Sequence, residues 1–417
     1  MNELVRRGTR GLLRDMNNSR VLQIIQAHGP ISRAEIAKIG DLQPPTVTAI
    51  VNDFLRADLV RETDLVRDNG NGSAAIGRRP ILLCLNETAA FAVGVKLRQN
   101  GMTIAVTDLG GTIVYLSESA LPNRTPDEAL RFIADRVENA IEVAAVNIAK
   151  VIGLGIGMPG MVDFRNGVCV FSPLLEWETV HVTSTLESIL GMPAYADNDV
   201  NMLTAAEIAY GEGREVSDFL TVTIGQGIGL GIVLRGEIFR GAGGGAGEFG
   251  HVKIDSDLLC ECGARGCLEA VASDVGISMQ VAAAKHLSSI GIDEALDLAR
   301  AGDSEVVAIV EHAGEVLGRS IGNLLNLFNP ELVIVTGEGT RAGDLLFAPM
   351  RLALEGAAFG TLGRDTRVIV QSLGDEAWAR GAASIVVHEM LKPPIYESRS
   401  AGPLVHLLAR SIQRGTA

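Results

Sequence analysis

The sequence predicts an α/β protein made of an N-terminal winged helix-turn-helix and a larger two-lobed body built from a duplicated unit. Three observations lead to this fold class. The first eighty residues hold two short helix patterns joined by a tight turn. The remainder shows, twice, three apolar strand patterns that lead into alternating helices and strands. The net charge also changes sign between the two parts.

Charge and hydropathy limit the classes of function. Residues 1–80 hold 12 Lys and Arg against 9 Asp and Glu, a net charge of +3; since the whole chain is at −14, the remainder is at −17. A basic segment on an acidic body fits a nucleic-acid module, although a difference of this size also arises by chance. No run of about 18 apolar residues is present, and the N-terminus lacks the apolar core of a signal peptide. We therefore expect a cytoplasmic protein with no membrane partner.

Capping and turn signals define the N-terminal helices. Ser32 and Glu35 form a capping-box pattern that opens a short helix. A turn at Gly40-Asp41 separates it from a second helix, which starts near Pro44-Pro45 because proline suits the first helical turn. The apolar side chains of this second helix share one face: Val47, Ile50, Val51, Phe54 and Leu55. Two short helices joined this way are typical of a helix-turn-helix.

Two strand candidates, residues 60–63 and 81–85, flank a polar, Gly-rich loop with the character of a wing. In such a domain the second helix enters the DNA major groove. The candidate DNA contacts are Gln43 and Asn52 for base edges, Thr46 and Thr48 for phosphates, and Arg78 and Arg79 for the backbone or minor groove. The alternative is a small helical domain for protein interactions, but helix spacing, wing and terminal arginines together favour DNA.

The body repeats one pattern. Strand patterns at 89–97, 102–109 and 112–119 precede a helix at 126–147 and a strand at 151–158. Gly110-Gly111 is expected to form a two-residue hairpin turn in which both residues take positive φ. The pattern recurs from Phe219 and includes a helix at 304–328 that stops at Asn329-Pro330. Two such halves predict two lobes with a cleft between them.

A cysteine cluster predicts a metal site. His251 precedes Cys260, Cys262 and Cys267, and clustered thiols in a cytosolic chain indicate metal rather than disulfides. Three thiolates and one imidazole complete a tetrahedral zinc site and leave no open position, so the zinc is expected to be structural. The alternative is three buried free thiols, which this density of cysteines disfavours. Cys84 and Cys169 stand alone in apolar runs and are expected in the core.

Several motifs carry a resemblance to the ROK family of repressors, open reading frames and sugar kinases. They are GMPG (157–160), SPLLEW (172–177), DNDVN (197–201), GEFGHVKID (247–255), CECGARGCLE (260–269), VTGEG (335–339) and LGDEAWARGAA (373–383). The resemblance implies an actin-like (ribonuclease H-like) ATPase-type body, and GRRPILLCLN (77–86) resembles the repressor branch. The expected domains are 1–85 for the winged helix-turn-helix, 86–200 plus 375–395 for lobe 1, 201–374 for lobe 2 with the zinc loop, and 396–417 for a tail.

The resemblance also implies a sugar pocket. The family's sugar-contacting positions match Gly160, Asn198, Asp199, Glu248, His251 and Glu269. In the kinases, the residue that matches Asp199 is the base that deprotonates the attacking sugar hydroxyl. Asp199 alone could also be the N-cap of the helix that follows it, since Asp is favoured there. The two roles do not exclude each other.

The nucleotide signatures are altered. Where kinases of the family carry GxDxGGTK, residues 94–101 place Lys96 at the acidic position and Arg98 and Gln99 at the two glycines. The second loop, 225–231, keeps most of its glycines but has Leu230 in place of one. Phosphoryl transfer needs both the phosphate cradle and the metal, so we expect no enzyme activity.

The sequence therefore predicts a DNA-binding regulator, a repressor of genes for sugar metabolism or transport. A sugar or sugar derivative bound in the cleft would be its effector. One winged helix reads one half-site, so a homodimer or homotetramer on operator DNA is expected. The alternative is an ATP-dependent sugar kinase fused to a DNA-binding domain.

Overall fold

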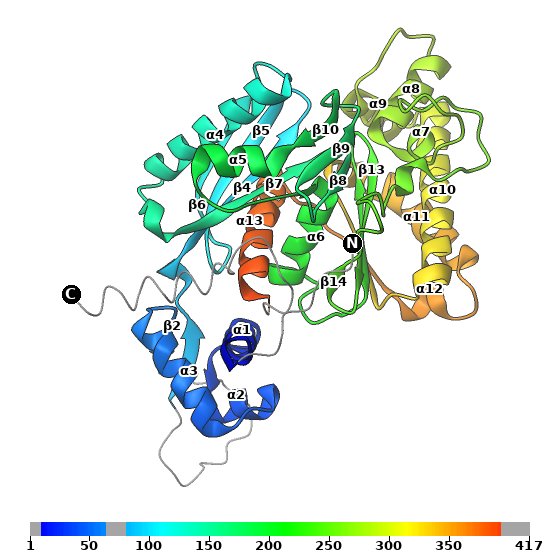
Figure 1. The fold of residues 1–417 in the computed structure, drawn as a ribbon. Helices are drawn as coiled ribbons and strands as arrows, with labels where there is room; N and C mark the ends of the chain where they lie inside the picture. Colours follow the sequence, from blue (N-terminus) through cyan, green and yellow to red (C-terminus); the bar gives the residue numbers. More distant parts are fainter. Residues whose placement is uncertain (1–9, 64–80, 393–417) are drawn as a thin grey trace.

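The computed structural model describes residues 10–63 and 81–392. Figure 1 shows a small helical part, which contains α1 (Arg10–His28), α2 (Arg33–Gly40) and α3 (Pro44–Arg56), below a larger body. Within the described residues, no helix is long and apolar enough to cross a bilayer. Arg78, Arg79 and the expected tail at 396–417 lie outside the described residues.

The N-terminal part is a three-helix unit with a small antiparallel sheet. Its elements are α1, β1 (Ile31–Ser32), α2, α3, β2 (Val60–Thr63) and β3 (Leu82–Leu85), with the strand order β1-β3-β2. In this unit α2 and α3 are the two predicted helices, and β2 and β3 are the two predicted strands. The capping box is confirmed, because Ser32 Oγ accepts from Glu35 N at 3.2 Å and the Glu35 carboxylate accepts from Ser32 N at 3.0 Å. Asp41 ends α2 in the left-handed conformation.

The first five-stranded sheet has the order β11-β7-β4-β5-β6. Its strands are β4 (Phe91–Arg98), β5 (Gly101–Asp108), β6 (Ile113–Ala120), β7 (Val151–Met158) and β11 (Ala194–Asn198). β4 pairs antiparallel with β5 and parallel with β7, which pairs parallel with β11. Helices α4 (Pro126–Val143) and α5 (Val182–Leu190) share an apolar core with this sheet. A separate small sheet contains β8 (Met161–Asp163), β9 (Val168–Ser172) and β10 (Trp177–His181).

The second five-stranded sheet repeats this arrangement. Its strands are β12 (Phe219–Ile224), β13 (Ile228–Leu234), β14 (Glu237–Ile238), β15 (Leu332–Thr336) and β16 (Arg367–Val370). The order β14-β13-β12-β15-β16 and the mixture of antiparallel and parallel pairs match the first sheet, so the predicted duplication is confirmed. Its helices are α7 (Glu269–Ala272), α8 (Asp274–Ala284), α9 (Ile292–Arg300), α10 (Ser304–Phe328), α11 (Asp344–Ala357) and α12 (Leu362–Asp365).

Two further helices connect the parts of the molecule. α6 (Asp199–Tyr210) follows β11, and α13 (Asp375–Leu391) returns from the second sheet to pack on the first. Side chains of α6 and α13 belong to the same apolar core as the N-terminal helices. Short 3₁₀ turns complete the chain: η1 (Glu87–Ala89), η2 (Ile148–Lys150), η3 (Phe249–His251) and η4 (Glu338–Ala342).

Two predicted details are wrong. Of the turn residues Gly110 and Gly111, only Gly111 has positive φ, at 80°. The Asp108 carboxylate accepts from the N–H groups of Gly110 and Thr112 at 2.9 and 2.8 Å, and this side-chain turn replaces the expected two-glycine hairpin. The helix expected to reach residue 147 ends at Val143, because Ala145 adopts a left-handed conformation.

Glycines allow α13 to approach the first sheet at backbone distance. A Cβ on Gly155 of β7 would lie 1.8 Å from Ala382 O, and one on Gly94 of β4 would lie 1.9 Å from Ala379 O. Neither contact can be relieved by rotating a side chain, because both partners are main-chain atoms. The close approach fixes α13 against the two strands.

Gly155→Ala should therefore lower the thermal unfolding midpoint by several degrees, since overpacking of this kind costs about 1–3 kcal/mol and each kcal/mol shifts the midpoint by about 2–4 °C. Gly356→Ala is the matched control. It lies exposed on α11 with open space around its Cβ position, and alanine there should leave the midpoint equal or higher. Scanning calorimetry of both variants checks this, and equal midpoints would contradict the close packing.

Candidate functional site

The motif residues 157–160 and 197–201 meet at one edge of the first sheet. Met158 at the end of β7 is the register partner of Asn198 at the end of β11. Gly160 has a φ of 104°, and a Cβ there would lie 2.4 Å from Phe171 O, so only glycine fits. Asn198 Nδ2 donates to Gly160 O at 3.0 Å, which ties the two motifs together.

The helix cap lies one residue earlier than the sequence indicates. Asn198 is the N-cap of α6, and its Oδ1 accepts from Val200 N at 2.9 Å. Asp199 is the first residue inside the helix, so the N-cap role considered for it is wrong. The amide of Asn198 supplies the cap as well as a carboxylate would. The N-terminal position of Asp199 favours its negative charge.

A buried ion pair lies behind this edge. Asp197 is 1% exposed, and its carboxylate accepts from Arg240 Nε at 2.6 Å and from Asn201 Nδ2 at 2.9 Å. Burial raises the pKa of Asp197, and the Arg240 charge opposes that rise. Arg240 follows β14 of the second sheet and lies 4.0 Å from the centre of the Phe164 ring. The sequence alone does not indicate this pair, because no local pattern joins residues so distant in the chain.

Three of the candidate sugar ligands are carboxylates close enough to interact. Burial raises the pKa of Asp199, while the charge of Lys96 lowers it. Burial also raises the pKa of Glu248, and the charges of Glu269 and Asp199 raise it further. Glu269 Oε2 accepts from Ile228 N at 2.9 Å. Because ionised carboxylates only accept hydrogen bonds, this cluster can bind a ligand that presents several hydroxyl groups.

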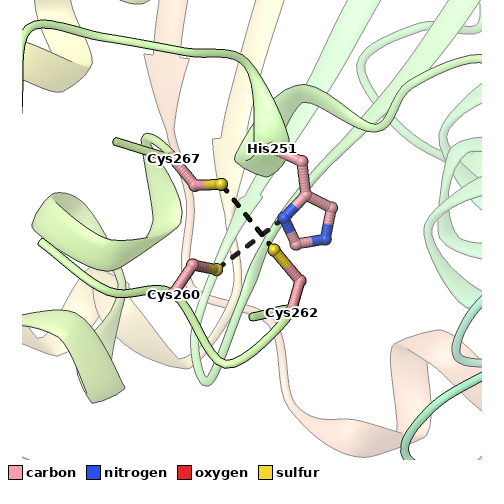
Figure 2. Close-up of side chains that lie close together, drawn as sticks. All are labelled: His251, Cys260, Cys262 and Cys267. Carbon is pink, nitrogen blue, oxygen red and sulfur yellow. Dashed lines mark hydrogen bonds between the residues drawn. The ribbon is translucent and has the colours of Figure 1, made fainter. Parts of the chain in front are cut away.

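The four predicted metal ligands come together, as Figure 2 shows. His251 Nδ1 lies 3.9 Å from Cys260 Sγ, and the sulfurs of Cys262 and Cys267 are 3.8 Å apart. The four ligand atoms all lie within 4.8 Å of one another. A tetrahedral site with bonds of about 2.3 Å to sulfur has edges of about 3.8 Å, so the spacing fits a metal ion at the centre.

The metal site is adjacent to the carboxylate cluster. His251 Nε2, the ring nitrogen that faces away from Cys260, lies 4.0 Å from Glu248 Oε2. Glu269 follows Cys267 by two residues and begins α7. An ion bound by the four ligands would therefore fix the loops that hold two of the three carboxylates.

The candidate DNA-contacting side chains lie on the outer face of α3. Gln43, Thr48 and Asn52 are exposed and Thr46 is half-buried, whereas the apolar stripe of the helix faces the core. Gln43 is the N-cap residue but makes no side-chain cap, and Thr48 Oγ1 donates to Pro44 O at 2.9 Å. Asp53 of α3 pairs with Arg14 of α1 at 2.8 Å. The sequence alone did not indicate that these two helices meet.

Ion-paired side chains lie at residues 94–101, where the first nucleotide signature was expected. Arg98 and Gly101 are register partners, so β4 and β5 join through Gln99-Asn100. Lys96 is buried and its Nζ lies 2.8 Å from Asp375 Oδ1, while Arg98 pairs with the same carboxylate. At the second loop, Cβ atoms on Gly225 and Gly227 would meet the carboxylates of Glu338 and Glu269.

Comparison with known proteins gives consistent matches. The ROK family profile matches residues 92–389. A putative xylose repressor from Caldicellulosiruptor sp. (strain Rt8B.4) is 32% identical over 406 residues, which cover 93% of this chain and 100% of the relative. The crystal structure of a ROK family transcriptional regulator, a homologue of the E. coli MLC protein, has a TM-score of 0.81 at 26% identity and covers 96% of this chain and 100% of its own.

A kinase structure matches a smaller part. The ROK family glucokinase from Streptomyces griseus, in complex with glucose and AMPPNP, has a TM-score of 0.60 at 27% identity. It covers 71% of this chain and 99% of its own.

Arg240→Met should lower the stability of the folded protein by about 3–5 kcal/mol, because it leaves the Asp197 carboxylate buried without a counter-charge. The loss should shrink as the pH is lowered, since protonation of Asp197 removes the unpaired charge. Adding Asp197→Asn should recover most of the loss. Urea unfolding of the two single variants and the double variant tests this, and a double variant no more stable than Arg240→Met would refute the pairing.

Proposed function

The chain belongs to the ROK family, and from this premise we propose that it is a transcriptional repressor of genes for sugar metabolism or transport. The observation that carries the proposal is the extent of the matches. The transcriptional regulator matches 96% of the chain, whereas the glucokinase matches 71%. The smaller share is about that of residues 92–389, which the family profile covers without the N-terminal part. The N-terminal winged helix is what a regulator adds to a kinase-like body.

The N-terminal domain, proposed as residues 1–85, would bind operator DNA through the exposed face of α3. Gln43 and Asn52 are proposed to contact bases, and Thr46 and Thr48 to contact phosphates, with Arg78 and Arg79 on the wing. Since one winged helix reads one half-site, the protein would act as a homodimer or homotetramer in the cytoplasm.

The cleft between the proposed lobes, residues 86–200 plus 375–395 and 201–374, would bind a sugar or sugar derivative. Its proposed ligands are Gly160, Asn198, Asp199, Glu248, Glu269 and, secondarily, His251. The electrostatic proximity of Asp199, Glu248 and Glu269 supports this proposal. A sugar hydroxyl needs such acceptors, because a buried polar group left unpaired costs about 1–3 kcal/mol.

Two helices connect the cleft with the DNA-binding domain. α6 begins at Asp199, and Arg214, which follows it, donates to the carbonyls of Gln26 and Ala27 at 3.3 and 3.1 Å, near the end of α1. α13 begins at the cleft and ends beside α1, where Gln23 Nε2 donates to the Leu391 carbonyl at 3.1 Å. A cavity of about 120 Å³ lies between α1, α6, β14 and α13. A sugar that moves either helix would thereby change operator affinity.

The alternative function is sugar phosphorylation, favoured by the retained Asp199 and the glycines of the second loop. We propose that the chain is not a kinase, because paired side chains take up the first phosphate loop and no acidic residue stands at the magnesium position there. A coupled assay with Mg-ATP and a panel of aldopentoses and aldohexoses separates the two functions. Turnover of about 1–100 s⁻¹, as kinases show, would establish the alternative.

We expect about one zinc ion per chain, bound by His251, Cys260, Cys262 and Cys267, because the donor set and its spacing suit tetrahedral zinc. Cys267→Ser should lose zinc and lower the unfolding temperature, since a structural metal stabilises the fold that holds it. Cys84→Ser, a half-buried cysteine away from the cluster, is the control and should keep its zinc. Metal analysis of the purified proteins decides, and zinc-free wild-type protein would contradict the site.

Asp199→Ala should bind operator DNA within about threefold of the wild-type affinity but lose the response to sugar, because the change removes a proposed sugar ligand and leaves α3 untouched. Asp135→Ala, an exposed aspartate on α4, is the control and should keep the response. Fluorescence anisotropy of operator DNA with and without sugar measures both effects. An unchanged sugar response in Asp199→Ala would remove Asp199 from the pocket.

A further inference from the structure

Lys96 is a buried cation at the edge of the cleft. It lies near the end of β4, and its side chain is 6% exposed. The ammonium lies 2.8 Å from Asp375 Oδ1, 3.8 Å from Glu338 Oε1 and 4.2 Å from the centre of the Trp378 ring. A buried lysine is retained only where partners compensate for the loss of water, and here two carboxylates and an aromatic face do so.

The position of Lys96 places it beside the proposed sugar ligands. Lys96 is the register partner of Gly157 on β7, and β7 in turn pairs with β11, which ends at Asn198. The three parallel strands therefore present Lys96, the Gly160 turn and Asp199 at the same edge. Burial raises the pKa of Asp199, the Lys96 charge opposes that rise, and the Glu338 charge adds to it.

Lys96 also joins elements from both halves of the body. Glu338 follows β15 of the second sheet, and Asp375 begins α13. Arg98, two residues from Lys96 on the same side of β4, pairs with Asp375 as well. Arg98 also lies 3.8 Å from Glu118 Oε2, so both cations are already paired with carboxylates. A free phosphate at this place would have to displace Asp375 or Glu338, which argues against an anion site.

We propose that Lys96 is a positioning residue, a built-in cation that lies beside Asp199 at the sheet edge and holds the Glu338 loop against the first sheet, so that the cleft accepts a sugar without a metal-bound nucleotide. The part of this proposal that concerns sugar rests on the proposed function. The part that concerns charge rests on the ion pairs of Lys96 with Asp375 and Glu338, and on the place of Lys96 beside β7 and β11. The two parts are tested separately.

The charge coupling is tested without any ligand. Unfolding free energies of wild type, Lys96→Met, Asp199→Asn and the double variant form a double-mutant cycle. Lys96→Met should destabilise the protein, and Asp199→Asn should be less harmful, or favourable, in the Lys96→Met background, because it removes a carboxylate that has lost its counter-charge. Lys285→Met combined with Asp199→Asn is the matched control. Lys285 also pairs with two carboxylates, Asp303 and Glu305, but outside the cleft, so its effect on the unfolding free energy should add to that of Asp199→Asn. Additive effects of Lys96→Met and Asp199→Asn would overturn the proposal.

The sugar arm uses D-xylose and D-glucose as probes in calorimetric titrations from pH 5 to pH 8, with and without Mg-ATP. Lys96→Met should weaken binding about tenfold at pH 7 and move the acidic loss of affinity to higher pH, because loss of a neighbouring cation raises the pKa of Asp199. Lys96→Arg should restore affinity, and Mg-ATP should leave wild-type affinity unchanged.

The outcomes separate the two claims. Suppose that the effects of Lys96→Met and Asp199→Asn on stability are not additive, but that wild type and Lys96→Met bind sugar equally well. This result would overturn the positioning role. Wild-type protein that binds neither sugar, nor any other in the panel, would count against the proposed function instead, and the cycle alone would then decide the charge role of Lys96.

Discussion

The concentration of carboxylates at one edge of the first sheet is the constraint on which the rest of the body depends. Carboxylates that lie close together repel one another, and a buried one such as Asp197 also resists ionisation unless it has a compensating partner. Asp197 has Arg240, Asp199 has the Lys96 charge, and Glu269 has the N–H of Ile228. Glu248 faces the imidazole of His251. Of these pairs, Asp197–Arg240 also joins the two halves of the body, because Arg240 follows β14 of the second sheet.

The candidate metal site belongs to the same arrangement. Its four ligands lie on a loop with little regular structure, and an ion would give that loop a fixed shape. Because Glu248 and Glu269 adjoin this loop, an ion bound there would also fix two of the proposed sugar ligands. A kinase and this regulator should differ in the charged groups at the nucleotide position. A kinase needs an open place for phosphates and magnesium. We propose that the ion-paired side chains of Lys96, Arg98, Asp375 and Glu338 fill the equivalent place in this chain.

Local signals allowed much of the fold to be predicted from the sequence. The capping box at Ser32, the end of α10 at Asn329 and the repeated strand pattern depend on neighbouring residues, and the structure confirms them. The cysteine cluster was predictable because metal ligands recur at short spacing. The pairs Asp197–Arg240 and Lys96–Asp375 were not, because their partners are distant in the chain and only the packing of α13 and β14 brings them together. The turn at Gly110-Gly111 was predicted wrongly because Asp108 offers the backbone a side-chain partner that the glycine pattern does not reveal.

We propose that sugar binding and operator binding are coupled, so that each changes the affinity for the other. The most direct measurement is the pair of linked affinities: operator affinity with and without saturating sugar, and sugar affinity with and without saturating operator DNA. Linkage requires the two ratios to be equal, and a coupling of 1–3 kcal/mol corresponds to about 5–150-fold. We expect equal ratios in this range. Sugar that binds tightly while operator affinity stays the same would contradict the account.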